Sequence, residues 1–155
     1  MELSELLTQA LQLERDGKDF YLRAARLAPN AAEMFERLAA DEEQHYATLQ
    51  RIMQAPDKLA DLLPSPTVPP LDVADPIFPR GVNPLDLLPP EPTVNDALVF
   101  GMSSEMKSVR LYREAARQAE PESAVYRLLV QLITAEVGHF NTLMQRYEAL
   151  NPYPA

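Results

Sequence analysis

Glu42 and His45 stand three residues apart in the segment LAADEEQHYATLQ, where a helix would ordinarily bury leucines. At helical spacing they share one stripe with the apolar residues Phe35, Leu38, Leu49 and Ile52. The same pairing of a glutamate and a histidine occurs at Glu136 and His139. A carboxylate and an imidazole are costly to bury alone, but both are ligands for divalent metal ions. The two pairs therefore predict metal chemistry inside a helical core.

The two halves of the chain resemble each other around these residues. LERDGKDFYLRAA, from Leu13, aligns with SEMKSVRLYREAA, from Ser104, and AADEEQHYATL aligns with ITAEVGHFNTL. The alignment pairs Glu14 with Glu105, Gly17 with Ser108, Tyr21 with Tyr112, Glu42 with Glu136 and His45 with His139. One helical hairpin thus occurs twice, and the chain's only two histidines take equivalent positions in it.

The elements that must position these side chains are four helices, over about residues 4–28, 31–55, 95–120 and 122–150. Prolines at 29 and 56 end the first two helices. Asn30, with Glu33 three residues later, predicts the cap of the second helix, and Pro121 predicts the first turn of the fourth. We expect an all-α, ferritin-like four-helix bundle formed by residues 1–155 as a single domain.

The crossover between the second and third helices, residues 56–94, holds 11 of the 15 prolines in the chain. So long an irregular connection inside a small domain needs a structural reason. It carries too many apolar residues for a free chain, among them Leu71, Val73, Ile77, Phe78, Leu85, Leu87 and Leu88. We therefore expect an ordered strap that joins two antiparallel hairpins, with a short helical turn at DKLADLL.

The four glutamates of the repeat can lie in one layer of this bundle. Glu14 and Glu105 each precede the end of their helix by 14 residues, about 21 Å, and Glu42 lies about 17 Å from the same turn as Glu14. Four buried carboxylates repel one another unless cations neutralise them. The predicted metal ligands are Glu14, Glu42, His45, Glu105, Glu136 and His139. Such a set, with open positions, suits iron or manganese better than a closed structural zinc site.

Residues near these ligands leave alternatives open. Tyr21 and Tyr112 lie two turns from Glu14 and Glu105, and either hydrogen-bond to carboxylates of a facing helix or are ordinary core tyrosines. Gly17, Gly101 and Gly138 lie inside helices, where glycine is unfavourable, and indicate either close helix packing or space beside the metals. Asp41 and Glu43, which flank Glu42, are expected to face water.

Composition narrows the classes of partner. The formal charge of −9 makes nucleic acid and anionic membranes poor candidates, and no apolar run is long enough to span a membrane. The absence of cysteine excludes disulfides and thiolate metal sites from these 155 residues. The acidic N-terminal segment lacks the basic start of a signal peptide, so we expect a cytoplasmic location.

The paired Glu-x-x-His motifs and the two additional glutamates resemble the rubrerythrin-like branch of the ferritin-like superfamily across all four helices. That resemblance implies a non-haem di-iron centre held by the six residues above, with manganese or zinc as alternative ions. It also implies an oxidoreductase that reacts with peroxide or dioxygen, and a homodimer. The alternative is a ferritin-like iron-binding, ferroxidase or storage protein without catalytic turnover.

The chain departs from that family in two respects. The cysteine-ligated iron domain of full-length rubrerythrins is absent, so an external electron donor would be needed. The family's additional carboxylate near the third-helix glutamate is also missing, since Met102 and Ser108 stand three residues to either side of Glu105.

Overall fold

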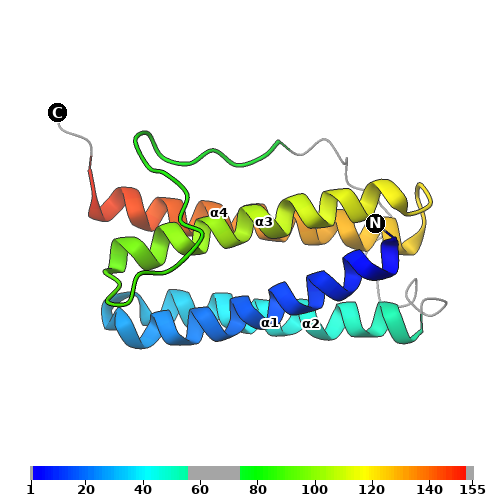
Figure 1. Cartoon of the computed structure of the whole chain (residues 1–155), viewed down its shortest axis with the longest axis horizontal. Coiled ribbons are helices and arrows are strands. Elements are labelled where there is room, and N and C mark those ends of the chain that lie inside the picture. Colours follow the sequence, from blue (N-terminus) through cyan, green and yellow to red (C-terminus); the bar gives the residue numbers. More distant parts are fainter. Residues whose placement is uncertain (1, 56–73, 153–155) are drawn as a thin grey trace.

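The structure, a computed structural model, describes residues 2–55 and 74–152. Four long helices make up the described chain, without a β-strand: α1 (Leu3–Leu27), α2 (Ala32–Gln54), α3 (Val94–Gln118) and α4 (Ala124–Leu150). Their bounds lie within two residues of the predicted ones. Figure 1 shows them as a bundle of two antiparallel hairpins, α1 with α2 and α3 with α4. The predicted all-α four-helix bundle is confirmed.

The starts of the second and fourth helices differ from the sequence predictions. Pro29–Ala31 form a short 3₁₀ helix, and α2 begins after Ala31 without a side-chain cap, so the predicted Asn30 cap is wrong. Pro121 is not in the first turn of α4 either, because Glu122 has a positive φ of 64° that a helix cannot accommodate. Ser123 caps α4 instead, where its side chain accepts a hydrogen bond from the Tyr126 amide.

The start of α3 has the capping box that its sequence favours. The Thr93 hydroxyl accepts a hydrogen bond from the Asp96 amide, and the Asp96 carboxylate accepts one from the Thr93 amide. This reciprocal pair fixes where the crossover ends and α3 begins. The register of Glu105, three turns into the helix, is set from this point.

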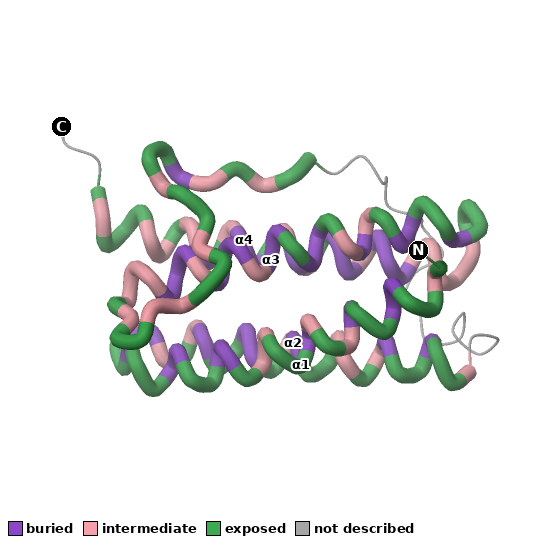
Figure 2. Tube along the Cα trace, viewed as in Figure 1, coloured by how far each residue is buried: buried purple, intermediate pink, exposed green. Residues whose placement is uncertain are grey.

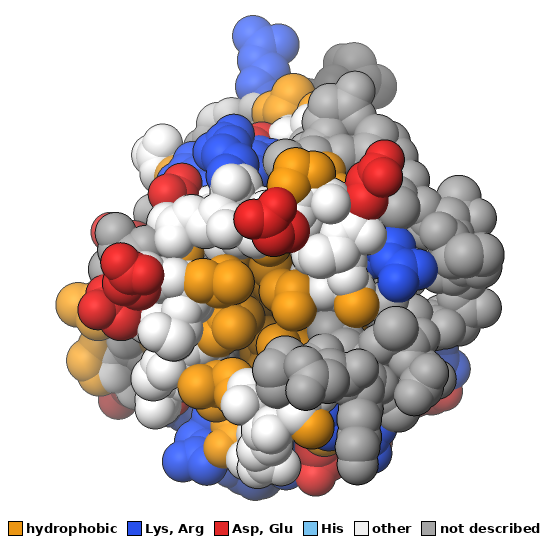
Figure 3. All heavy atoms as spheres, turned by 90° about the vertical axis from the view of Figure 1, so that its right-hand side faces the viewer, with side chains coloured by type: hydrophobic (Ala, Val, Ile, Leu, Met, Phe, Trp, Pro, Cys, Tyr) orange, Lys and Arg blue, Asp and Glu red, His pale blue; other side chains and the backbone are white. Residues whose placement is uncertain are grey.

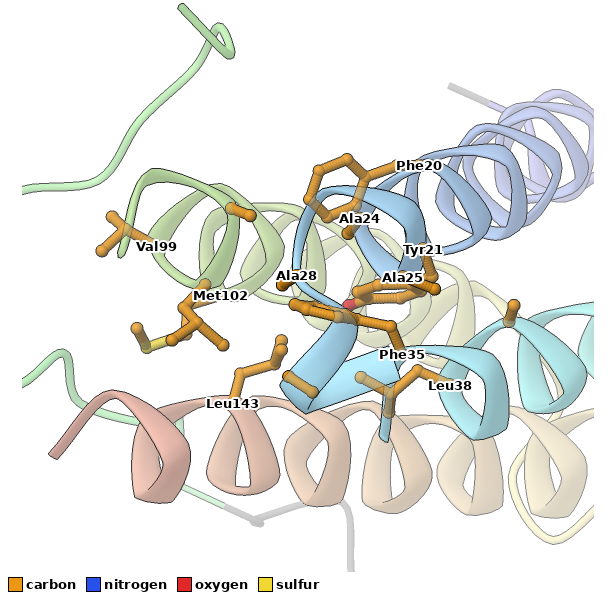
Figure 4. Packing of buried hydrophobic residues seen from close by; sticks show 14 of the residues in the cluster. Phe20, Tyr21, Ala24, Ala25, Ala28, Phe35, Leu38, Val99, Met102 and Leu143 are labelled. Atoms are coloured by element: carbon orange, nitrogen blue, oxygen red, sulfur yellow. The ribbon is translucent and has the colours of Figure 1, made fainter. Parts of the chain in front are cut away.

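The core consists of two apolar clusters at opposite ends of the bundle. One is built around Phe35, Leu98 and Phe140, and the other around Leu49, Leu129 and Ile133. All four helices contribute to both clusters, and in each helix the glutamate of the repeat lies between its two apolar segments or at their junction. Figure 2 shows the buried stretches facing inward along the bundle, and Figure 4 shows the packing of the first cluster. The two clusters thus enclose a polar layer.

The crossover packs on the second hairpin where the structure describes it. Phe78, Val82, Leu85 and Leu88 are partly buried against the first apolar cluster. The Leu85 amide donates to Ser103 Oγ at 2.9 Å, and the ring of Phe78 meets that of Phe140 edge-on at 5.1 Å. The predicted ordered strap is therefore present over residues 74–93.

Other parts of the strap prediction fare differently. Ile77 and Leu87 are 82% and 83% exposed, so these two residues do not anchor the strap. Leu71, Val73 and the predicted turn at DKLADLL lie outside the described residues.

The end of the bundle where α1 begins carries an apolar surface. Figure 3 shows hydrophobic side chains gathered at its centre, with charged side chains around them. Within residues 2–55 and 74–152, no helix combines the length and the apolar character that crossing a membrane requires.

Candidate metal centre

All six predicted ligands meet in the layer between the two apolar clusters. Glu14 comes from α1, Glu42 and His45 from α2, Glu105 from α3, and Glu136 and His139 from α4. The four glutamates are at most 3% exposed, and the imidazole rings lie 5.7 Å apart and nearly parallel. The ligands are this deeply buried because each helix carries a glutamate on its inward face, at the level where the neighbouring positions carry apolar core residues.

The side chains fall into two groups of potential ligands that share two members. One group is Glu14, Glu42, His45 and Glu136, and the other is Glu42, Glu105, Glu136 and His139. Within each group, one potential ligand atom from every residue lies within 4.8 Å of the others. If each group held one ion, Glu42 and Glu136 would be shared between the two ions. Glu14 and His45 would belong to one ion, and Glu105 and His139 to the other.

The imidazole nitrogens point at the carboxylates from close range. His45 Nδ1 lies 2.8 Å from Glu136 Oε1 and 3.5 Å from Glu14 Oε1. His139 Nδ1 lies 3.4 Å from both Glu42 Oε1 and Glu105 Oε1. The two histidines thus present the same nitrogen to the same layer, each from the second helix of its hairpin.

Despite these short distances, the layer is poorly satisfied by protein hydrogen bonds. Among the described residues, seven buried side-chain nitrogen or oxygen atoms lack a hydrogen-bond partner, and six of the seven belong to this cluster. They are one oxygen each of Glu14 and Glu105, both oxygens of Glu136, and Nδ1 of His45 and His139. Buried polar atoms are ordinarily paired, and orphan atoms of ligand type that converge on one point fit bound cations.

Both tyrosines hold carboxylates of the opposite hairpin. Tyr21 Oη donates to Glu105 Oε1 at 2.5 Å, and Tyr112 Oη donates to Glu14 Oε1. Both rings are buried, and that of Tyr21 stacks on Phe35 in the cluster of Figure 4. Of the two sequence-based alternatives, the structure shows the hydrogen bond to a facing helix. Each tyrosine fixes one oxygen of a glutamate and leaves the other free to bind.

Protons compensate the negative charge of the metal-free layer. Burial, and next the negative charge of Glu105, raise the pKa of both Glu42 and Glu136 above the ordinary range. For Glu105, burial raises the pKa, but the neighbouring Glu136, His139 and the Tyr21 hydroxyl outweigh it and lower the pKa. Burial lowers the pKa of His139, while Glu105 and Asp41 raise it, to about 9 overall. A bound cation would replace these protons.

Asp41, which the sequence analysis expected to face water, contacts one of the predicted ligands. Its side chain is half exposed, yet Oδ2 lies 3.0 Å from His139 Nε2, across the bundle on α4. A carboxylate on the outer nitrogen fixes an imidazole so that its other nitrogen faces the metal. The position of Asp41 directly before Glu42 carried no signal for this contact, because the sequence does not say which helix lies beside α2.

The three helical glycines have different surroundings. A Cβ at Gly17 would lie 3.3 Å from the carboxylate of Glu42, and one at Gly101 would lie 2.9 Å from Leu143. Close packing therefore accounts for both. A Cβ at Gly138 would meet no atom of the described residues within 4 Å outside its own stretch of helix, so packing does not explain that residue.

Comparison with known families agrees with this geometry. Residues 5–76 match the family model described as Rubrerythrin, which covers α1, α2 and the start of the crossover. Neither the comparison with curated proteins nor that with solved structures gave a match. The matched segment supplies Glu14, Glu42 and His45, and the internal repeat supplies their counterparts on α3 and α4. Residues 5–76 are therefore similar to the Rubrerythrin family, and the carboxylate–histidine cluster lies in the middle of the four-helix bundle that this segment forms with α3 and α4.

Proposed function

We propose that the chain binds two iron ions in the carboxylate–histidine layer and reduces peroxide or dioxygen with electrons from an external donor. The observation that carries the proposal is the convergence of six buried ligand side chains from four helices, with six of their atoms unpaired. The match to Rubrerythrin over residues 5–76 supports iron in particular.

The protein residues supply binding, orientation and protection from water. Glu42 and Glu136 are shared between the two groups, so they would hold the two ions close together. Tyr21, Tyr112 and Asp41 fix the directions of Glu105, Glu14 and His139. When bound, a ferrous pair supplies two electrons and a Lewis acid to an oxygen substrate.

The electron donor, the oligomeric state and the location of the protein are further parts of the proposal. These 155 residues contain no cysteine for a thiolate-bound iron site, and we propose that the electrons come from a donor outside them. A homodimer and a cytoplasmic location stay predictions from the family resemblance and from the sequence.

Anaerobic loading with Fe²⁺, followed by mixing with hydrogen peroxide, tests the proposal. We expect two ferrous ions per chain, rapid oxidation seen in the absorption of the ferric product, and repeated turnover when a reductant is present. A single stoichiometric oxidation without recycling would contradict catalysis.

Two controls separate the metal layer from the rest of the protein. Zinc-loaded protein has the same ligands filled by an ion without redox chemistry, so it should not consume peroxide. The double variant His45→Ala, His139→Ala should lose iron and peroxide consumption together. If it keeps both, the layer is not the centre.

A further inference from the structure

A cavity of about 370 Å³ lies between α1 and α3 and reaches the metal layer. Its inner end is formed by Glu42, Glu105 and the ring of Tyr21, all at most 3% exposed. One oxygen of Glu105 there has no hydrogen-bond partner. The cavity therefore ends at carboxylates that the proposed function assigns to iron.

Small residues at equivalent positions of the repeat help to form this inner end. Gly17 follows Glu14 by three residues and Ser108 follows Glu105 by three, and both line the cavity. A side chain at position 17 would press on the Glu42 carboxylate, since its Cβ would come within 3.3 Å. Ser108 is a small polar residue, so it leaves space beside Glu105 at this end of the cavity.

One wall of the cavity is apolar and is formed by Leu13, Phe20, Leu88 and Phe100, with the two phenylalanine rings 4.7 Å apart. The charged residues Asp16, Asp19, Arg23 and Lys107 also line the cavity. Leu88 belongs to the crossover, not to a helix. Two neighbouring contacts hold that segment on α3, namely the Leu85 amide on Ser103 and Asp86 at 3.7 Å from Lys107. The crossover thus supplies one wall of a pocket whose floor is the metal layer.

The volume and the lining indicate what this pocket accepts. A water-sized molecule needs only about 10–15 Å³ of such space, whereas sites for small organic ligands begin at about 300 Å³. Hydrogen peroxide or dioxygen would leave most of the pocket empty. An apolar wall beside a polar floor matches a molecule with one hydrocarbon end and one oxygen-rich end.

We propose that this cavity binds a small organic hydroperoxide, with its hydrocarbon group against Phe20, Leu88 and Phe100 and its peroxide group at Glu42 and Glu105. The proposal rests on the proposed function and adds its substrate class. In the reaction the O–O bond takes up two electrons and two protons, and the hydroperoxide becomes an alcohol and water. The electrons come from the ferrous pair and are restored by the external donor, such as a small redox protein.

Two tryptophan variants of the crossover test the pocket. Leu88→Trp fills the cavity, whereas Leu87→Trp adds the same ring at the neighbouring residue, which is 83% exposed. In anaerobic stopped-flow mixing of Fe²⁺-loaded protein, we expect Leu88→Trp to slow oxidation by cumene hydroperoxide about tenfold or more. Oxidation by hydrogen peroxide should be much less affected. Leu87→Trp should match the wild type with both oxidants.

A second measurement does not depend on catalysis. Zinc-loaded protein is titrated with cumyl alcohol, the product of cumene hydroperoxide reduction, and followed by NMR. We expect the Phe20 and Phe100 resonances to shift in the wild type and in Leu87→Trp, and not to shift in Leu88→Trp. Leu88→Ala, which removes the wall instead of filling the pocket, should weaken binding several-fold.

The outcomes separate the pocket from the metal chemistry. If hydrogen peroxide oxidises the iron and cumene hydroperoxide does not, the pocket proposal is wrong and the proposed function stands. If neither oxidant reacts, the proposed function is wrong, and the alcohol titration still decides whether the cavity takes an organic ligand. If the wild type and Leu88→Trp bind cumyl alcohol equally, the proposal that this cavity binds an organic hydroperoxide is wrong.

Discussion

The two hairpins agree on their inner faces and differ on their outer ones. Inside, each carries a glutamate, a tyrosine and a Glu-x-x-His pair at matching positions. Outside, Arg15 of α1 donates a hydrogen bond to Tyr46 of α2 at 2.8 Å, on a face open to water. The equivalent residues of the second hairpin, 91 and 94 positions further on, are the buried Met106 and Phe140.

The crossover accounts for this difference in polarity. Phe78 packs edge-on against Phe140, so the outer face of the second hairpin is covered where that of the first is exposed. An outer position is polar when it meets water and apolar when another segment packs on it. The inner positions follow a different rule, because all of them serve one shared layer. The repeat therefore persists where both hairpins face the same chemistry.

The symmetry of the layer itself fails at one position. Asp41 contacts the outer nitrogen of His139, but the residue equivalent to Asp41 in the second hairpin is Ala135, which offers His45 no carboxylate. An ion held by Glu105 and His139 would thus have a support that an ion held by Glu14 and His45 would lack. The two proposed metal positions would therefore be chemically inequivalent.

Removing a shared ligand should have the largest effect. Glu42 belongs to both groups, so Glu42→Gln should reduce the iron content from two ions to none. Glu14→Gln removes a ligand from one group only and should leave one ion bound. Elemental analysis and calorimetric titration with Fe²⁺ under anaerobic conditions measure both. Equal loss in the two variants would contradict the assignment of Glu42 as a bridge.

Asp41→Ala should weaken the ion at the His139 position by about 10–100-fold, because His139 loses the partner that orients its ring. The other position should change little, so the titration should split into two steps. Glu43→Ala is the matched control, since Glu43 is exposed and its carboxylate lies 3.3 Å from the ammonium group of Lys18. A uniform change at both positions would mean that Asp41 acts through general electrostatics.

Periodicity and the repeat were enough to predict the bundle, the layer and the residues that meet in it. They sufficed because buried polar groups at helical spacing stand out against an apolar stripe. Contacts across the bundle, such as that of Asp41 with His139, depend on which helices are neighbours, and no residue pattern states that. The start of α4 was missed because a positive φ at Glu122 is a local exception to residue preference.

The pH dependence of the metal-free protein follows from the raised pKa values of Glu42, Glu136 and His139. A raised folded-state pKa gives stability that is complete below the unfolded-state value and is lost as the pH rises. For the glutamates the loss begins above about pH 4.5, and for His139 it falls between about 6.5 and 9. The pKa of Glu105 is lowered, so its contribution is lost only in acid.

We therefore expect the free energy of unfolding of the metal-free protein to fall from pH 6.5 to 9, by about 1.4 kcal/mol per pH unit for each proton involved. Denaturant titrations at several pH values measure this slope. His139→Gln should reduce the slope by the contribution of one proton. Metal-loaded protein, in which ions replace the protons, should lose less stability over the same pH range. If the metal-free protein is equally stable at pH 6.5 and pH 9, the layer does not hold the extra protons.

Tyr21 and Tyr112 each donate a hydrogen bond to a glutamate of the other hairpin. Replacing each tyrosine tests whether the two hydrogen bonds contribute equally to stability. Tyr21→Phe leaves Glu105 without its donor, and Tyr112→Phe does the same to Glu14. Each should cost about 1–3 kcal/mol of unfolding free energy in the metal-free protein, measured by denaturant titration. Tyr126→Phe, on a half-buried side chain away from the layer, is the control. If only one of the two variants loses unfolding free energy, only one of the two tyrosine–glutamate hydrogen bonds stabilises the metal-free protein.

The smallest effect on stability is expected from replacing Gly17 and Gly138 by alanine. The two glycines differ in their surroundings. Gly138→Ala places a methyl group where no described residue outside the same stretch of helix lies within 4 Å, so the gain in helix propensity should stabilise the protein by about 1 kcal/mol. Gly17→Ala has the same gain in propensity, but its methyl group pushes the Glu42 carboxylate from 3.3 Å. We expect little net change in thermal stability together with weaker iron binding. If Gly17→Ala stabilised the protein as much as Gly138→Ala and bound iron normally, Glu42 would have room to move, and the small residue at position 17 would not be needed by the layer.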